Sequence, residues 1–235
     1  MADVFNLGKL IADIRSEHEK RAAEEGLTLE QYETRERLKA ADEERARLEL
    51  ADRRHRAARL AESGIGITPE DFANIIDDRI NPTPPLKHVR WWAEAIKGQK
   101  ACPRILVLLG GIGCGKTVAS AWAVAAIGGG GLRAPELPQT VFPWRGEKAT
   151  VDLRHRGVVV LDDLGTEITD QRYHQALGAF IDLRVSRGWT IITSNLTRAE
   201  FRARYDERVI SRLNHVGRSV ELATAPSLRR NEGGL

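Results

Sequence analysis

The chain has 235 residues, 42% of them hydrophobic and 29% charged, which suits one domain with an appendage and excludes collagen-like and wholly disordered chains. Its formal net charge of +3 permits contact with nucleic acid without establishing it. Cys102 and Cys114 are too few for a disulfide framework, and the six scattered histidines lack zinc-binding spacing. Apolar runs are too short to cross a bilayer, and the charged N-terminus is unlike a signal peptide. We therefore expect a cytoplasmic protein with no membrane contact.

Residues 1–62 predict a charged helical arm. They contain 13 basic and 15 acidic residues and no proline. Apolar residues recur at the spacing of one helix face: Leu7, Leu10, Ile11 and Ile14. Gly26 is a candidate C-cap for this helix. Thr28 and Gln31 fit a capping box that opens a second helix over residues 29–62.

The second predicted helix carries few apolar side chains and no clean heptad: Tyr32, Leu38, Leu48, Leu50 and Leu60. A helix that is polar nearly all round either stands in solvent or packs on a partner. Because so few apolar residues give a helix little support of its own, we favour an interaction arm, with a solvated helix as the alternative.

Residues 63–103 form a predicted connecting region between the arm and a core over residues 104–235. The segments GIGITPEDF and NPTPP break it into short helices. Adjacent side chains on a helix point about 100° apart, so at most one of Trp91 and Trp92 can lie deep in a core. Packing is the expected role of both, and base stacking is the alternative.

From Arg104 onward, short apolar runs alternate with helical segments. RILVLL, VVVLDD and WTIITSN read as buried strands, and TVASAWAVAAI and DQRYHQALGAFIDLRVSR read as helices, the second closed by Gly188. Continuous apolar strands separated by helices are typical of a parallel sheet that is covered on both faces. The predicted fold class is α/β.

A phosphate-binding loop follows the first of these strands. Its G-x-x-x-x-G-K-T motif lies between a strand and a helix, as the chemistry requires. Backbone N–H groups and the helix N-terminus would bind the phosphates of ATP. Lys116 would reach the β- and γ-phosphates, and the Thr117 hydroxyl would hold Mg²⁺. The predicted nucleotide-binding residues are Gly110, Gly111, Ile112, Gly113, Cys114, Gly115, Lys116, Thr117 and Val118.

Polar residues end the next two predicted strands. Asp162 and Asp163 follow VVVL, and Asn195 follows TIITS, which places all three at the ligand-binding edge of a parallel sheet. Asp162 is the candidate Mg²⁺ ligand, and Asp163 is the candidate general base, with Glu167 as the alternative. Asn195 would hydrogen-bond the γ-phosphate or the attacking water.

The motifs GGIGCGKT, VVVLDDLG, TIITSN and ERVISRL occur in this order and resemble the AAA+ ATPases of the bacterial and phage helicase-loader group, the DnaC type, over residues 63–230. IstB-type transposition ATPases share these motifs. The resemblance implies a P-loop sheet of strand order 5-1-4-3-2 and a homo-oligomer when assembled. It also implies that Arg212 is an arginine finger acting on the neighbouring subunit's ATP, with Arg208 as a second contact in trans.

The chain departs from this pattern in two places. Residues 128–156 must supply both a strand, expected over residues 137–142, and a crossover helix, expected over residues 147–155. This leaves scarcely any room for the DNA-gripping helix that such proteins often insert here. After a last strand expected over residues 218–222, only 13 residues follow, so we expect no C-terminal helical lid domain.

These features predict an AAA+ helicase loader that binds Mg·ATP between subunits and controls the loading of a replicative hexameric helicase onto single-stranded DNA. The N-terminal helices would bind the helicase. Two alternatives stay open: an IstB-like ATPase that assembles on DNA and recruits a transposase, and a nucleotide-switched binding module with negligible turnover. Asp163 gives the last alternative some weight, because it is one methylene shorter than the glutamate common at this position.

Overall fold

The computed structural model describes residues 7–143, 152–154 and 157–222 of the chain. Its contacts divide the chain into two compact units, Met1–Asp52 and Arg53–Leu235. The predicted boundaries after residues 62 and 103 stay predictions, and the first unit ends ten residues before the predicted end of the arm. None of the helices within the described ranges is long and apolar enough to cross a membrane.

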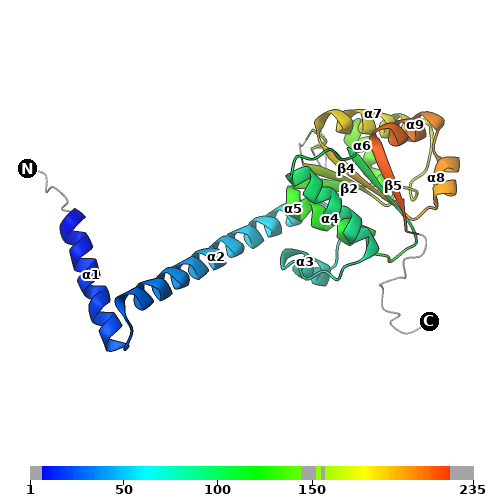
Figure 1. Cartoon of the computed structure of the whole chain (residues 1–235). Coiled ribbons are helices and arrows are strands. Elements are labelled where there is room, and N and C mark those ends of the chain that lie inside the picture. The colour runs from blue at the N-terminus through cyan, green and yellow to red at the C-terminus, as the bar shows by residue number, and fades with distance from the viewer. Residues whose placement is uncertain (1–6, 144–151, 155–156, 223–235) are drawn as a thin grey trace, which may run out of the picture. The chain divides into compact units, whose positions relative to one another are not determined.

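Two helices, α1 (Leu7–Glu24) and α2 (Leu29–Ala61), begin the chain, and α2 continues into the second unit (Figure 1). Gly26 has a φ of +69° and ends α1 in a Schellman motif, in which the Leu27 N–H donates to the Ala22 carbonyl at 2.9 Å. The predicted capping box is confirmed: the Thr28 N–H donates to Gln31 Oε1 at 3.0 Å, and the Gln31 N–H donates to Thr28 Oγ1 at 3.3 Å.

A small cluster around Tyr32 holds the two helices together. Tyr32 is buried, its ring centroid lies 5.5 Å from that of His18, and the Arg35 guanidinium lies 5.1 Å from its ring. Arg35 also forms an ion pair with Glu25 at the turn. This end of the hairpin is therefore held by local contacts.

Beyond this cluster, α2 buries almost nothing. Every residue over 37–55 is exposed, and Leu38 and Leu48 are 63% and 61% exposed. The last turn of α2 differs, because Leu60 is buried against α5 and Arg59 donates to the Ala125 carbonyl at 3.3 Å. A long middle stretch of α2 therefore has no apolar support within the described part of the chain.

The second unit is a five-stranded, all-parallel sheet of order β2-β3-β4-β1-β5. This order confirms the one expected from the resemblance. The strands are β1 (Ile105–Leu109), β2 (Gly129–Arg133), β3 (Val158–Asp162), β4 (Trp189–Ser194) and β5 (Gly217–Glu221). Apart from the end of α2, the helices of this unit are α3 (Pro69–Ile76), α4 (Pro84–Lys97), α5 (Lys116–Ile127), the 3-10 turn η1 (Ala134–Glu136), α6 (Leu137–Val141), α7 (Gln171–Arg187), α8 (Arg198–Arg204) and α9 (Glu207–Val216).

Helices cover both faces of this sheet, which confirms the predicted α/β class (Figure 1). Leu106 and Leu108 of β1 pack among residues of α4 and α5. Their neighbours Ile105 and Val107 point to the opposite face, where residues of α6, α7, α8 and α9 form a second apolar cluster. All residues of β1 and β3 are buried, so the centre of the sheet is a rigid base for the loops at its edge.

The strand expected over residues 137–142 was wrong. Leu137–Val141 is the helix α6, and β2 is instead formed by the glycine-rich segment Gly129–Arg133. A Cβ on Gly129 would lie 1.8 Å from the Val158 carbonyl oxygen, and one on Gly131 would lie 2.4 Å from Ile65 Cγ1. The glycines therefore allow a close approach of neighbouring backbone and do not break the sheet.

The helix expected over residues 147–155 lies mostly outside the described residues, and residues 152–154 form a turn. The prediction that at most one of the adjacent tryptophans lies deep in a core is confirmed. Trp92 is fully buried, and its Nε1 donates to the Pro103 carbonyl at 2.8 Å, whereas Trp91 is 46% exposed. The strand expected over residues 218–222 is β5, shifted by one residue at each end.

Candidate functional site

The loop between β1 and α5 has the backbone of a phosphate cradle. Gly113 and Gly115 have φ values of +83° and +89°, in the left-handed region that favours glycine. A Cβ on Gly110 would lie 2.8 Å from Leu222 Cβ, so the loop also passes close to the end of the sheet. Helix α5 begins at Lys116 directly after the loop, and its free N–H groups make this an electropositive end.

Lys116 lies inside this loop. It is 5% exposed, and its Nζ donates to the carbonyls of Gly110 and Gly111 at 2.9 and 2.8 Å and to Asn195 Oδ1 at 2.9 Å. All three acceptors are neutral, so among the described residues no carboxylate hydrogen-bonds to the ammonium group and cancels its charge. The position suits an anionic ligand of the loop.

Thr117 and Asp162 bring a hydroxyl and a carboxylate together beside the loop. Thr117 Oγ1 lies 3.1 Å from each carboxylate oxygen of Asp162, and Thr193 Oγ1 donates to Asp162 Oδ1 at 2.6 Å. Burial raises the pKa of Asp162, and the nearby Asp163 raises it further, against the hydrogen bonds from Thr193 and Thr117 and the charge of Lys116. A buried carboxylate beside a hydroxyl is a donor set that Mg²⁺ accepts.

Asn195 links the lysine to the second aspartate. Its Oδ1 accepts from Lys116, and its Nδ2 lies 3.5 Å from Asp163 Oδ1. Asp163 has a φ of +58°, and its N–H donates to Thr193 Oγ1 at 2.9 Å, which holds the backbone in this uncommon conformation. The structure thus brings together five of the residues predicted from sequence: Lys116, Thr117, Asp162, Asp163 and Asn195.

The carboxylate of Glu167 is committed to a different set of contacts. Its side chain is 1% exposed and accepts from the Gly165 N–H at 2.7 Å, from Tyr205 Oη at 2.6 Å and from Arg204 Nε at 3.3 Å. Burial and Glu167 together raise the pKa of the Tyr205 hydroxyl. This buried cluster ties the loop after β3 to the junction of α8 and α9. Sequence reasoning missed it, because Glu167 and Tyr205 are far apart along the chain.

The two predicted trans arginines both lie on α9. Arg208 is exposed. Arg212 Nη2 lies 3.0 Å from Asp182 Oδ2 on α7, and its guanidinium rests over Gly178 one turn earlier. Among the described residues, neither arginine forms a hydrogen bond or ion pair with the P-loop cluster, and their roles stay predictions.

Comparison with known proteins reveals similarity in structure. No protein-family model and no curated protein match the sequence. The solved structure titled DnaI is 18% identical over 68% of this chain and 96% of that chain, with a TM-score of 0.52. The DnaC helicase loader is 22% identical over 61% and 94%, with a TM-score of 0.46. AMPPCP-bound DnaA from Aquifex aeolicus is 16% identical over 61% and 48%, with a TM-score of 0.47.

At these identities the likeness to the DnaI structure concerns the fold alone. It supports the predicted α/β fold, a five-stranded parallel sheet covered by helices. The chemistry of the site must be argued from the residues themselves.

Proposed function

We propose that this chain is an AAA+ ATPase that binds Mg·ATP and uses its nucleotide state to load a replicative DNA helicase onto single-stranded DNA. The observation that carries the ATPase part is the linked set Lys116, Asn195 and Asp163, which stands beside the Thr117–Asp162 pair at one edge of the sheet. This set offers a cation for phosphate, a polar amide, a second carboxylate and a metal-binding pair within one site.

The residues present fit the nucleotide and its metal ion. The loop N–H groups and Lys116 would hold the β- and γ-phosphates, and Thr117 and Asp162 would hold Mg²⁺. Among the described residues, no group of three or more His, Cys, Asp or Glu side chains could hold a metal ion. The remaining ligands of Mg²⁺ would therefore be water and phosphate oxygens. When bound, Mg·ATP supplies the phosphoanhydride bond and the charge on its γ-phosphate.

The side chains then divide the work of hydrolysis. Asp163 would accept a proton from the attacking water, and Asn195, held by Lys116 on one side, would orient that water or the γ-phosphate. By the resemblance of the motifs, Arg212 and Arg208 would act on the ATP of a neighbouring copy, and in its own chain Arg212 instead pairs with Asp182. A guanidinium there would stabilise charge that develops on the γ-phosphate.

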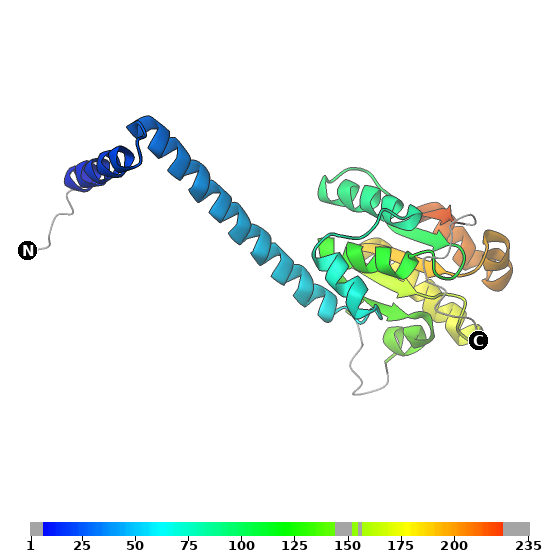
Figure 2. The same ribbon diagram turned by 90° about the horizontal axis from the view of Figure 1, so that it is seen from below.

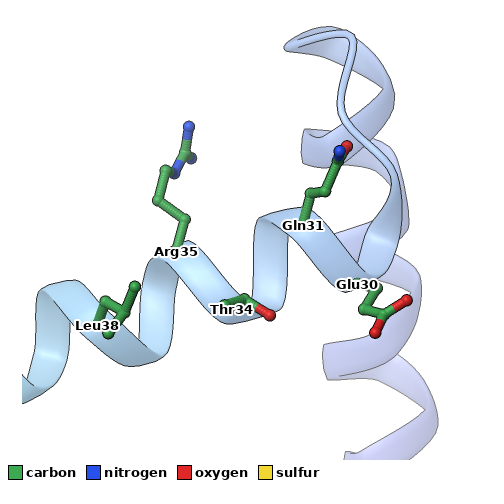
Figure 3. A pocket seen from close by; sticks show the side chains of 5 residues that line it. All are labelled: Glu30, Gln31, Thr34, Arg35 and Leu38. Atoms are coloured by element: carbon green, nitrogen blue, oxygen red, sulfur yellow. The ribbon is translucent and has the colours of Figure 1, made fainter.

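The arm supports the assignment of a protein partner. Exposed leucines and dense charge along residues 37–55 leave a helix that gains support only by packing on another surface. Near the turn, Glu30, Gln31, Thr34, Arg35 and Leu38 line a hollow on α2, shown in Figure 3. We propose a hexameric helicase as the partner, in line with the DnaC helicase loader among the similar structures.

Capture of the helicase tests this proposal. The triple variant Leu38→Ala, Leu48→Ala, Leu50→Ala should lose binding to the cognate helicase ring in a pulldown and keep ATP binding, because these side chains are at least half exposed. Phe142→Ala removes an exposed apolar side chain outside the arm and is the matched control. If the wild-type chain captures no helicase, or captures a transposase in its place, the loader proposal is wrong. If the chain captures the helicase but does not hydrolyse ATP, the remaining interpretation is a nucleotide-switched binding module.

A further inference from the structure

Two tryptophans and two arginines form a row on one face of the sheet, at the end where the strands begin. The Arg104 guanidinium lies 5.1 Å from the ring centroid of Trp189, and the Arg218 guanidinium lies 5.0 Å from that of Trp91. We call Trp189, Arg104, Arg218 and Trp91 the Trp–Arg row. It lies at the opposite edge of the sheet from the P-loop, which follows the carboxyl end of β1.

The alternation of the strands places these residues on one face. Trp189, Arg104 and Arg218 each precede by two positions a residue that packs in the cluster with α4 and α5, namely Ile191, Leu106 and Val220. Backbone hydrogen bonds continue the ladder past β1: the Thr190 N–H donates to the Arg104 carbonyl at 2.9 Å, and the Arg104 N–H donates to the Val216 carbonyl at 3.0 Å.

Three adjacent strands and one helix contribute to the row in spatial order. The strands lie in the order β4, β1, β5. Trp189 begins β4, Arg104 directly precedes β1, Arg218 belongs to β5, and Trp91 lies on α4. Figure 2 shows α4 and α5, the teal and green helices, on the near face of the sheet. The row is therefore a surface feature of the second unit alone.

Three members of the row are exposed, whereas Trp189 is half-buried and packs against the apolar cluster with α4 and α5. Arg104 and Arg218 are exposed, and Trp91 is 46% exposed, the largest exposed aromatic surface among the described residues. Residues 87–104, which cover α4 after its first turn and the segment into β1, contain a single acidic residue, Glu94. They contain five basic residues, Lys87, Arg90, Lys97, Lys100 and Arg104, of which Arg90 forms an ion pair with Asp78 at 2.7 Å.

The N–H groups of a guanidinium lie in its own plane and point outward from its edges. A guanidinium that lies over an indole ring can therefore still donate to phosphate oxygens. The exposed ring surface can meanwhile accept a base. Alternating cations and aromatic rings suit a flexible strand that offers phosphates and unpaired bases in turn. A duplex offers no base faces to such rings.

We propose that the Trp–Arg row binds single-stranded nucleic acid, with phosphates on Arg104 and Arg218 and a base stacked on the exposed ring of Trp91. This inference does not depend on the proposed ATPase, because the row shares no residue with the nucleotide site. The sequence predicts scarcely any room for a DNA-gripping helix between α5 and β3, and the row would supply a different surface for that contact.

Fluorescence anisotropy with labelled oligothymidine tests the proposal on the full chain. The double variant Arg104→Gln, Arg218→Gln should bind at least about tenfold more weakly. The slope of log affinity against log salt should fall by about 1.4, because each phosphate contact to a single strand contributes roughly 0.7. The matched control is Arg172→Gln, Arg202→Gln, which removes two exposed arginines from α7 and α8 and should bind as the wild type does.

Stacking is tested separately with Trp91. Trp91→Ala should weaken binding of oligothymidine roughly 5- to 150-fold, the range expected for loss of one stacked base. Trp91→Phe should retain most of the affinity, and an abasic oligomer should bind wild type and Trp91→Ala equally. The same titration with oligouridine shows whether DNA or RNA is preferred. Thermal unfolding of each variant confirms that it is folded.

Three results would overturn the proposal. The wild-type chain could fail to bind oligothymidine at low salt, the double arginine variant could bind with wild-type affinity, or the control variant could lose as much. If the wild type binds abasic and base-carrying oligomers equally, bases do not stack on the Trp–Arg row. Binding of duplex DNA in preference to single strands would also contradict this stacking.

Discussion

In the unit Arg53–Leu235, every residue of β1 and β3 is buried between two layers of helices, whereas every residue of α2 over 37–55 is exposed. The sheet has its own apolar clusters on both faces. The hairpin has one buried tyrosine, a Schellman motif, a capping box and ion pairs between neighbouring turns.

This contrast separates two sources of order. The sheet is stabilised by burial of apolar surface, the dominant favourable contribution to folding. The helix α2 depends on local terms of a few tenths of a kcal/mol each, such as i,i+4 ion pairs. Changes in the first region should therefore act on the nucleotide site or the fold, and changes along the second should act on a partner.

The largest expected effect is on nucleotide binding by the sheet unit. Lys116→Ala should abolish or greatly weaken binding of ATP, because the variant loses the ammonium group that lies within the loop. Titration with a fluorescent ATP analogue measures this. Lys39→Ala, an exposed lysine on α2, should bind as the wild type does. Wild-type affinity in Lys116→Ala would reject the site, and unchanged thermal unfolding would show that the fold is intact.

Arg212→Ala should spare ATP binding by the single chain and lower turnover by the assembly about 10³-fold or more, the scale of an arginine finger. Mixing is the sharp measurement. Arg212→Ala and Lys116→Ala proteins, each inactive alone, should regain turnover together, since some interfaces then pair an intact loop with an intact arginine. Absence of recovery despite demonstrated co-assembly would leave Arg212 as the partner of Asp182 on its own surface.

Asp163→Asn should keep ATP binding and lower turnover roughly 10²–10⁴-fold, as loss of a general base does.

Glu167→Gln should act differently from Asp163→Asn. The amide NH2 of the glutamine would replace an acceptor oxygen opposite the Gly165 N–H or the Tyr205 hydroxyl, so one hydrogen bond would be lost. We therefore expect the free energy of unfolding to fall by about 1–3 kcal/mol. Steady-state turnover and chemical denaturation separate the two variants. The reverse pattern would make Glu167 the base.

On the arm, Tyr32→Ala should open the helical hairpin, because Tyr32 is its buried centre against His18 and Arg35. Hydrogen exchange of the α1 amides should speed up. Leu48→Ala is the matched control and should change stability by less than about 0.5 kcal/mol, because the side chain is 61% exposed. Equal protection of α1 in both variants would contradict this account of the hairpin.

The smallest effect concerns the stability of the site itself. Burial raises the pKa of Asp162 in the folded chain above its unfolded value. The protonated side chain therefore favours the folded state below the unfolded pKa, and this contribution to folding stability is lost as the pH rises through the folded pKa. Asp162→Asn should therefore raise Tm slightly at neutral pH and abolish Mg²⁺-dependent turnover. Thermal unfolding at neutral and acid pH measures the difference, which should vanish in acid. A lower Tm at neutral pH would contradict it.

Several features followed from contiguous residues because their physics is local. The P-loop and the turn at Gly26 each lie within a few residues, and their backbone requirements are written in glycine, lysine and threonine. The strand order came from the resemblance of the motifs. The pair Asp162 and Asn195 could be placed at one edge because parallel strands end together.

The sequence determined the α/β class, the cradle around Lys116 and the capped hairpin, because periodicity and short motifs express backbone preferences directly. Only the tertiary structure decided that Gly129–Arg133 is a strand, since the need for glycine there comes from Val158 and Ile65, which lie elsewhere in the chain. It also decided that Glu167 is bound by Tyr205 and that the Trp–Arg row exists. Contacts between distant segments depend on the order and packing of the whole sheet, which no local pattern encodes.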